Sequence, residues 1–164
     1  MGFIDTIKAR AKADKKVIVL PETEDRRTYE ATAQILKEGI ADVVLVGSEE
    51  AIKKGSEGLD ISGAKIVDPA TSEKTQGYID KLVELRSKKG MTPEQAKEIL
   101  LNQYLYYGVM MVKMGDADGM VSGACHSTAD TLRPCLQILK TKPGTKLVSA
   151  FFLMVVPDCE YGAN

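Results

Sequence analysis

The sequence contains few of the residues that build metal clusters and disulfide frameworks. Its 164 residues include three cysteines, one histidine and no tryptophan. Three irregularly spaced cysteines do not make a disulfide framework, and no Cys-x-x-Cys or Cys/His spacing of a zinc site occurs. The single histidine, His126, excludes a site built from several histidines. We therefore expect a reduced, cytoplasmic protein without a metal site.

Strong charge of one sign is absent as well. The formal net charge is -1, so the sequence offers no basic surface for nucleic acid or for an anionic membrane. The longest apolar run, Leu147–Pro157, is about half as long as a bilayer span. The first residues lack the charged and then apolar pattern of a signal peptide. We expect neither nucleic-acid nor membrane partners.

Short apolar runs alternate with segments of helical periodicity. Strands are predicted at residues 16–20, 42–46, 65–67, 120–121 and 147–156. Helices are predicted at residues 3–13, 26–37, 72–88, 92–113 and 127–140. The apolar runs are continuous, which is typical of a parallel sheet covered on both faces. The pattern predicts an α/β fold with a doubly wound, mostly parallel sheet flanked by helices.

Some helix boundaries carry specific sequence signals. Thr92, Pro93 and Gln95 form the cap, first turn and capping box of a helix start. Gly115 predicts the end of that helix. Pro134 predicts either a kink in the last helix or a helix that begins only there.

The stretch Val121–Pro134 joins a predicted strand to a predicted helix. The small residue Gly123 allows a ligand to approach the backbone. The hydroxyls of Ser127 and Thr128, with the amides of the helix start, offer donors to an anion. Arg133 adds a planar cation suited to phosphate. The stretch predicts a phosphate-binding corner, with these candidate substrate-binding residues: Ser122, Gly123, Ser127, Thr128 and Arg133.

Structural roles stay open for the same residues. Ser127 is also a good helix cap, with Asp130 three residues later completing a capping box. Asp130 is the one acid close enough in sequence to suggest a partner for His126, so we expect a structural hydrogen bond there. We do not expect His126 to act as a general base. An arginine near a helix start, such as Arg133, is ordinarily a solvated surface residue.

Acidic residues next to the strands have two interpretations. Glu22, Asp25 and Arg26 follow the first strand and either line a cleft or cap the next helix; the cap is slightly favoured. Asp116 and Asp118 lie in a glycine-bounded turn, where carboxylates are ordinary turn residues.

The Val121–Pro134 stretch resembles the Ser-Gly-Ala-x-His-Ser/Thr-Thr-x-Asp-x-Leu/Val-Arg-Pro element of phosphotransacetylases. These enzymes exchange acetyl groups between phosphate and coenzyme A. The resemblance extends from Phe3 to Asn164. Four other segments agree with the family in order and spacing: Leu20–Arg26, Ala41–Gly47, Leu85–Thr92 and Gly115–Gly119.

The resemblance implies a phosphate acetyltransferase that moves acetyl reversibly between acetyl phosphate and coenzyme A. It implies that Arg133, with Ser127 and Thr128, holds the acyl-phosphate end. It places a coenzyme-binding arginine at Arg86, although a basic cluster at a helix end also complements the helix dipole. It implies no tightly bound cofactor, since coenzyme A, acetyl phosphate and inorganic phosphate are substrates or products. A cytoplasmic homodimer is the implied full-length form.

The family is about twice this length and has two α/β domains facing a cleft. We therefore expect residues 1–145 to form the first domain and 146–164 the opening strand of a truncated second domain. The catalytic residues, a Ser-Arg pair and an Asp in this family, would lie in the second half, so this chain alone should be inactive. Two alternatives stay open: a phosphate butyryltransferase, and a non-catalytic coenzyme A or nucleotide-sensing module like the carboxyl-terminal domain of some malic enzymes.

Overall fold

The computed structural model describes residues 2–156 and 160–161. Its centre is a four-stranded, all-parallel sheet of order β3-β2-β1-β4. The strands are β1 (Val17–Leu20), β2 (Asp42–Val46), β3 (Lys65–Val67) and β4 (Gly119–Met120). The chain winds from β1 outward to β3 and then returns to pair β4 with the other side of β1. The winding direction therefore reverses between β1 and β4, as in a doubly wound sheet.

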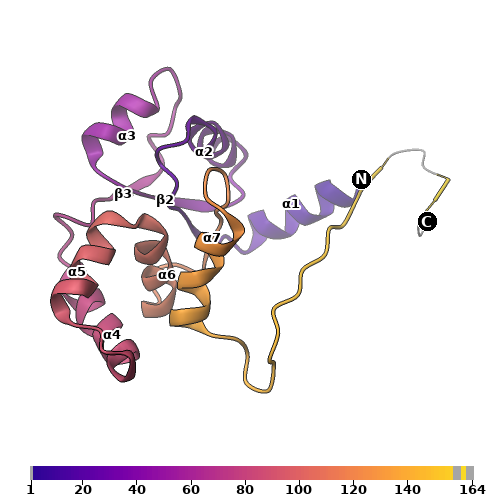
Figure 1. Cartoon of the computed structure of the whole chain (residues 1–164). Helices are drawn as coiled ribbons and strands as arrows, with labels where there is room; N and C mark the ends of the chain where they lie inside the picture. Colours follow the sequence, from indigo (N-terminus) through magenta and orange to yellow (C-terminus); the bar gives the residue numbers. More distant parts are fainter. Residues whose placement is uncertain (1, 157–159, 162–164) are drawn as a thin grey trace.

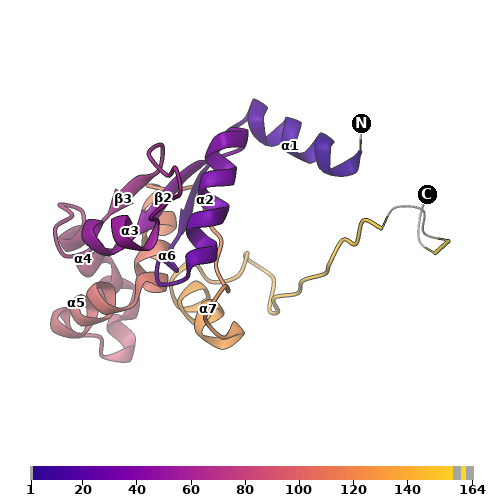
Figure 2. The same ribbon diagram turned by 90° about the horizontal axis from the view of Figure 1, so that it is seen from above.

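Helices connect the strands and cover the sheet (Figures 1 and 2). They include a short 3-10 turn, η1 (Ser87–Lys89), and a π-helical turn, η2 (Cys135–Leu139). Among the described residues, no helix has the length and apolarity that a membrane crossing requires. The α-helices are α1 (Phe3–Ala13), α2 (Arg26–Glu38), α3 (Glu49–Gly55), α4 (Thr75–Arg86), α5 (Pro93–Asn102), α6 (Tyr104–Met114) and α7 (Thr128–Pro134).

Alternate residues of β2 face opposite layers of the fold. Val43 and Leu45 pack in a cluster with side chains of α2 and α3. Val44 and Val46 belong to a larger cluster with α4, α5 and α6. Both faces of the strand are buried, so its sequence is apolar without alternation. The predicted α/β sheet with helices on both faces is confirmed.

The predicted helix over residues 92–113 is wrong in one respect, because two helices occupy it. Thr92 caps α5 with the expected capping box to Gln95. The backbone leaves the helical region at Gln103, with φ -126° and ψ 89°, and α6 begins at the next residue. Residues 105–111 of α6 are all buried. The chain turns at Gln103 so that this apolar helix packs against the sheet, a tertiary effect that helical periodicity does not report.

Two further differences concern helices. The short helix α3 was not predicted, since it buries only Ile52 and leaves little periodic signal. The helix containing Pro134 begins earlier, at Thr128, because Ser127 caps it. Pro134 is therefore not the helix start, and the chain continues beyond it as the π-helical turn η2.

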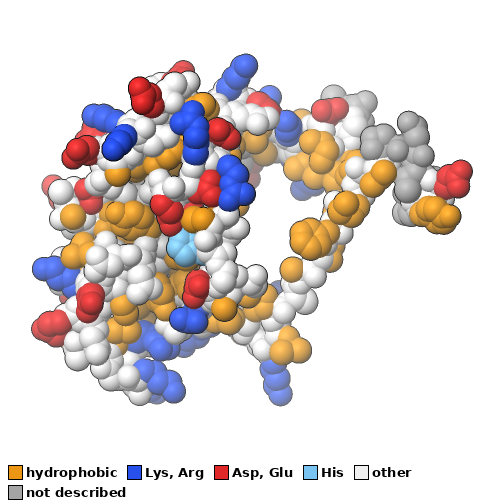
Figure 3. Space-filling model, turned by 45° about the horizontal axis from the view of Figure 1, so that its top comes forward, with side chains coloured by type: hydrophobic (Ala, Val, Ile, Leu, Met, Phe, Trp, Pro, Cys, Tyr) orange, Lys and Arg blue, Asp and Glu red, His pale blue; other side chains and the backbone are white. Residues whose placement is uncertain are grey.

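The predicted strand over residues 147–156 is not formed. No helix or strand occurs between residues 141 and 156, and Phe152 is 94% exposed. This segment and its apolar side chains extend away from the body of the molecule (Figures 1 and 3). A strand requires a hydrogen-bonding partner, and these residues pair with none of the described strands. The division into domains 1–145 and 146–164 stays a prediction.

Candidate functional site

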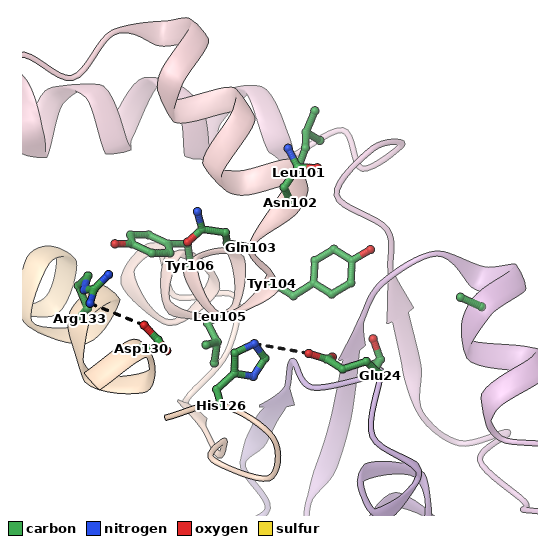
Figure 4. Close-up of a pocket in the computed structure, with 12 residues that line it drawn as sticks. Glu24, Leu101, Asn102, Gln103, Tyr104, Leu105, Tyr106, His126, Asp130 and Arg133 are labelled. Atoms are coloured by element: carbon green, nitrogen blue, oxygen red, sulfur yellow. Dashed lines mark ion pairs between the residues drawn. The ribbon is translucent and has the colours of Figure 1, made fainter. Parts of the chain in front are cut away.

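A pocket of about 570 Å³ lies at the carboxyl edge of the sheet (Figure 4). Thr23 and Glu24 reach it from the loop after β1, and His126 from the loop after β4. Asp130 and Arg133 line it from α7, and residues 101–106 at the α5–α6 junction form much of the remaining wall. Ligands of open α/β sheets bind where the winding direction reverses, and β1 and β4 flank that position here.

The loop after β4 is closed around a carboxylate of the protein itself. Glu22, which follows β1, is only 2% exposed. Its Oε2 accepts the backbone N–H groups of Gly123 at 2.6 Å and Ala124 at 2.7 Å. Its Oε1 accepts those of Cys125 and His126, each at 3.1 Å. The amide of Gly123, predicted to lie at a substrate phosphate, thus donates its hydrogen bond to the buried carboxylate of Glu22.

The ionised form of Glu22 is strongly favoured. Burial by itself would raise the pKa of this carboxyl. Hydrogen bonds from the amides of Ala124 and Cys125, the imidazole of His126 and the amide of Gly123 outweigh that effect and lower the pKa from 4.5 to about 2. The loop therefore encloses a negative charge at neutral pH.

The imidazole of His126 lies between two glutamates. Its Nδ1 is 2.8 Å from Oε1 of Glu22, and its Nε2 is 3.5 Å from Oε1 of Glu24. The expected partner Asp130 is wrong, because α7 begins only at Thr128 and His126 precedes that helix. The true partner Glu22 is 104 residues away in sequence. Figure 3 shows this histidine at the surface beside acidic side chains.

The predicted role of Ser127 as a helix cap is confirmed. Its Oγ accepts the N–H of Asp130 at 3.1 Å and donates to Oδ2 of the same residue at 2.6 Å. Thr128, the first residue of α7, is exposed and is not part of the pocket lining. Ser122 lines a separate cavity of about 160 Å³ on the side of α2. The five residues predicted from this stretch are therefore not brought together around one cavity.

The two arginines predicted to bind phosphates differ in their relation to the pocket. Arg133 lines the pocket, is 59% exposed and lies 3.7 Å from Oδ1 of Asp130. Burial raises the pKa of Tyr106, and the positive charges of Arg133 and Arg86 oppose that rise. Tyr106 lines the pocket, whereas Arg86 does not. The Nε of Arg86 is buried and has no hydrogen-bond partner within the described part of the chain.

Glu22, Cys125 and His126 together offer three donor atoms within 4.8 Å of one another. Their chemistry does not fit a metal ion. Both oxygens of Glu22 already accept backbone and imidazole hydrogen bonds. Burial, followed by the carboxylates of Glu24 and Glu22, raises the pKa of Cys125 to about 12, so its sulfur keeps its proton at neutral pH. Since the thiolate is the nucleophilic form of cysteine, Cys125 is also a poor nucleophile at neutral pH.

The Glu22 contact was the element of the site that sequence reasoning missed. Glu22 was noted beside Asp25, which does cap α2 by accepting the N–H of Arg27 at 2.9 Å. A glutamate directly after a buried strand, at the same edge as a small-residue loop, was the available signal. The pairing itself depends on the β1–β4 register, which places both segments at one edge.

Known proteins share the sequence and the fold of this chain. The chain is 58% identical over 164 residues to the phosphate acetyltransferase of Acetivibrio thermocellus and 54% to that of Thermoanaerobacterium thermosaccharolyticum. These alignments cover 100% of this chain and 49% and 50% of the relatives.

The fold matches the EutD phosphotransacetylase from Staphylococcus aureus with a TM-score of 0.86 and 41% identity, over 94% of this chain and 47% of that chain. The chain thus spans about half the length of the relatives it matches. Residues 2–162 match the family described as "Phosphate acetyl/butaryl transferase". The chain belongs to this phosphate acyltransferase family.

Proposed function

We propose that this chain forms the amino-terminal part of a phosphate acetyltransferase. The enzyme would transfer an acetyl group reversibly between acetyl phosphate and coenzyme A. The observation that carries the proposal is the pocket at the reversal of the sheet, lined by Arg133, in a chain whose full length aligns with phosphate acetyltransferases. A cytoplasmic homodimer belongs to the same proposal, by resemblance to the family.

Arg133 is the best supported ligand contact. Its pairing with Asp130 at 3.7 Å joins two half-exposed side chains, and such pairs contribute about 1 kcal/mol or less. A phosphate that accepts two hydrogen bonds from the guanidinium can replace that contact without a large loss. We assign Arg133 to the acyl phosphate or to a phosphate of coenzyme A, and Arg86 to coenzyme A.

We also assign Ser127, Thr128, Gly123 and Ser122 to the substrate. Ser127 shares its hydroxyl with Asp130, and Thr128 is exposed at the start of α7. Gly123 shapes the loop with a φ of 108°, which an L side chain rarely adopts. Ser122 would need to reach the ligand from the other side of this loop.

The reaction requires little more than orientation and charge stabilisation from these residues. The thiol of coenzyme A loses its proton to a base, and the sulfur bonds to the acetyl carbonyl carbon. The carbon–oxygen bond to phosphate then breaks, and phosphate leaves with the electron pair. Arginine side chains hold the two substrates together and stabilise the phosphate charge. We assign the base to the half of the enzyme that this chain does not contain.

Calorimetric titration of the 164-residue chain with coenzyme A tests the proposal. Arg133→Ala should weaken binding by about tenfold or more, because a charge-assisted hydrogen bond contributes roughly 1.5–3 kcal/mol. Arg10→Ala, on α1 and outside the pocket lining, is the matched control and should bind like the unmodified chain. Equal binding by all three proteins would remove Arg133 from the site.

Turnover distinguishes the remaining alternatives. Acetyl, propionyl and butyryl phosphate should be compared with this chain and with the full-length protein. We expect turnover only in the full-length protein, with acetyl phosphate preferred. A preference for butyryl phosphate would indicate a butyryltransferase. Coenzyme A binding without turnover of any acyl phosphate by the full-length protein would indicate a sensing module.

A further inference from the structure

The contact between Glu22 and the loop after β4 resembles an anion-binding site that is already filled. Consecutive backbone N–H groups that converge on one point usually enclose an external anion such as phosphate. Here the N–H groups of residues 123–126 converge on the Glu22 carboxylate at 2.6–3.1 Å. A substrate phosphate cannot use these amides unless it displaces a buried side chain. The loop must therefore serve the pocket in another way.

The same carboxylate determines how His126 carries its proton. An ionised carboxylate accepts hydrogen bonds and cannot donate one. Oε1 of Glu22 lies 2.8 Å from Nδ1, so that nitrogen holds the hydrogen. In the neutral ring, the lone pair is then on Nε2. That atom faces Glu24, whose side chain is 52% exposed, across the pocket that both residues line.

We propose that Glu22 is a positioning residue, which closes the loop after β4 and fixes His126 as the Nδ1–H tautomer so that Nε2 is presented to the ligand. The loop thereby acts through an oriented imidazole instead of through its amides. In this tautomer Nε2 has no hydrogen to donate, so the 3.5 Å approach of Glu24 is not a hydrogen bond. Glu24 is also exposed, so a ligand can take its place. Because an unprotonated Nε2 accepts hydrogen bonds, the ligand group must be a donor, such as a protonated phosphate oxygen or the thiol of coenzyme A. Only the identity of that ligand rests on the proposed function.

Nitrogen-15 NMR of the histidine ring tests the tautomer directly. His126 is the only histidine in the sequence, so its ring signals need no assignment. At alkaline pH the unmodified chain should show a protonated Nδ1 and an unprotonated Nε2. A predominant Nε2–H form would overturn the proposal. Because this measurement uses the unmodified chain, it does not depend on whether a variant folds.

Variants distinguish the effect of Glu22 on the His126 tautomer from the effect of Glu24. In Glu22→Gln the side-chain amide can donate to Nδ1, so the Nε2–H tautomer should become substantially populated. Glu22→Asp, which keeps the charge on a shorter side chain, should restore the Nδ1–H form at least in part. Glu24→Gln removes an equal charge next to the other nitrogen and should leave the tautomer unchanged. An unchanged tautomer in a folded Glu22→Gln chain would contradict the role of Glu22.

Titration of the labelled chain with inorganic phosphate, and separately with coenzyme A, tests the ligand contact. Either ligand should shift the Nε2 signal more than the Nδ1 signal. If calorimetry detects coenzyme A binding but neither ligand shifts Nε2, the contact is wrong and the proposed function stands. If calorimetry detects no binding, the proposed function fails for this chain, and the tautomer measurement still decides the role of Glu22.

Discussion

The amino and carboxyl edges of the sheet hold their polar groups in different ways. At the amino edge, Asp116 accepts the hydroxyl hydrogen of Tyr78 at 2.5 Å and pairs with Lys74. Burial would raise the pKa of Asp116, but these two partners lower it. The three residues are among those that line a hollow of about 450 Å³ there. Their charges and hydrogen bonds are directed at one another, which leaves a stabilising cluster.

At the carboxyl edge, one buried carboxylate with short hydrogen bonds lies beside polar side chains that have only distant neighbours. Glu22 is buried and accepts four backbone N–H groups. Within the described residues, the carboxylates nearest to Arg133 and to the Nε2 of His126 are 3.7 and 3.5 Å away. Cations and imidazoles with weak partners can exchange them for a ligand, whereas short buried pairs cannot do so cheaply. This difference supports our proposal that the ligand binds at the carboxyl edge.

Removing the Glu22 carboxylate should give the largest effect on stability. Glu22→Ala leaves four N–H groups without their acceptor, and hydrogen bonds to a charged group contribute roughly 1.5–3 kcal/mol each before water replaces part of them. We expect the free energy of unfolding to fall by about 3–5 kcal/mol. Urea unfolding followed by circular dichroism measures it. A loss below about 1 kcal/mol would mean that the loop hardly depends on Glu22.

Acid should weaken the carboxyl edge in a defined pH range. The pKa of Glu22 is about 2 in the folded protein and 4.5 as an ordinary carboxyl. Ionised Glu22 therefore stabilises the fold fully above pH 4.5, and this contribution disappears as the pH falls toward 2. It amounts to something on the order of 3 kcal/mol.

Urea midpoints measured between pH 5 and pH 3 check this range. The unmodified chain should lose stability more steeply than Glu22→Gln, which has no carboxyl to protonate. Asp116 also has a lowered pKa and contributes to the slope of both proteins. Parallel curves for the two proteins would show that Glu22 is not the group that titrates.

A carboxylate at the amino edge provides the smallest expected effect and the sharpest contrast with Glu22. Oδ2 of Asp118 accepts a single N–H, that of Val17, at 2.8 Å in an exposed position. Asp118→Ala should therefore lower the free energy of unfolding by about 1 kcal/mol or less, since water can take the place of the carboxylate. Chemical denaturation beside Glu22→Ala compares the two edges. A loss equal to that of Glu22→Ala would remove the difference between them.

The local elements of this fold could be predicted because short-range chemistry specifies them. The β-branched runs of β1 and β2, the capping box at Thr92 and the cap at Ser127 are formed by residues within four positions of one another. The break at Gln103 could not be predicted, because packing of α6 against the sheet decides it. Residues 147–156 have strand composition, but a strand also requires a neighbour to pair with.

For the site, the residue pattern by itself singled out Arg133 and the loop before its helix, and the family resemblance added Arg86. Only the tertiary structure decided how these groups are used. The parallel pairing of β1 with β4 brings Glu22 to a loop more than a hundred residues away. There its carboxylate accepts backbone N–H groups of the loop and lies within hydrogen-bonding distance of the His126 imidazole. Hydrogen bonds form between groups that are close in space, and for this buried carboxylate the sheet topology provides that closeness.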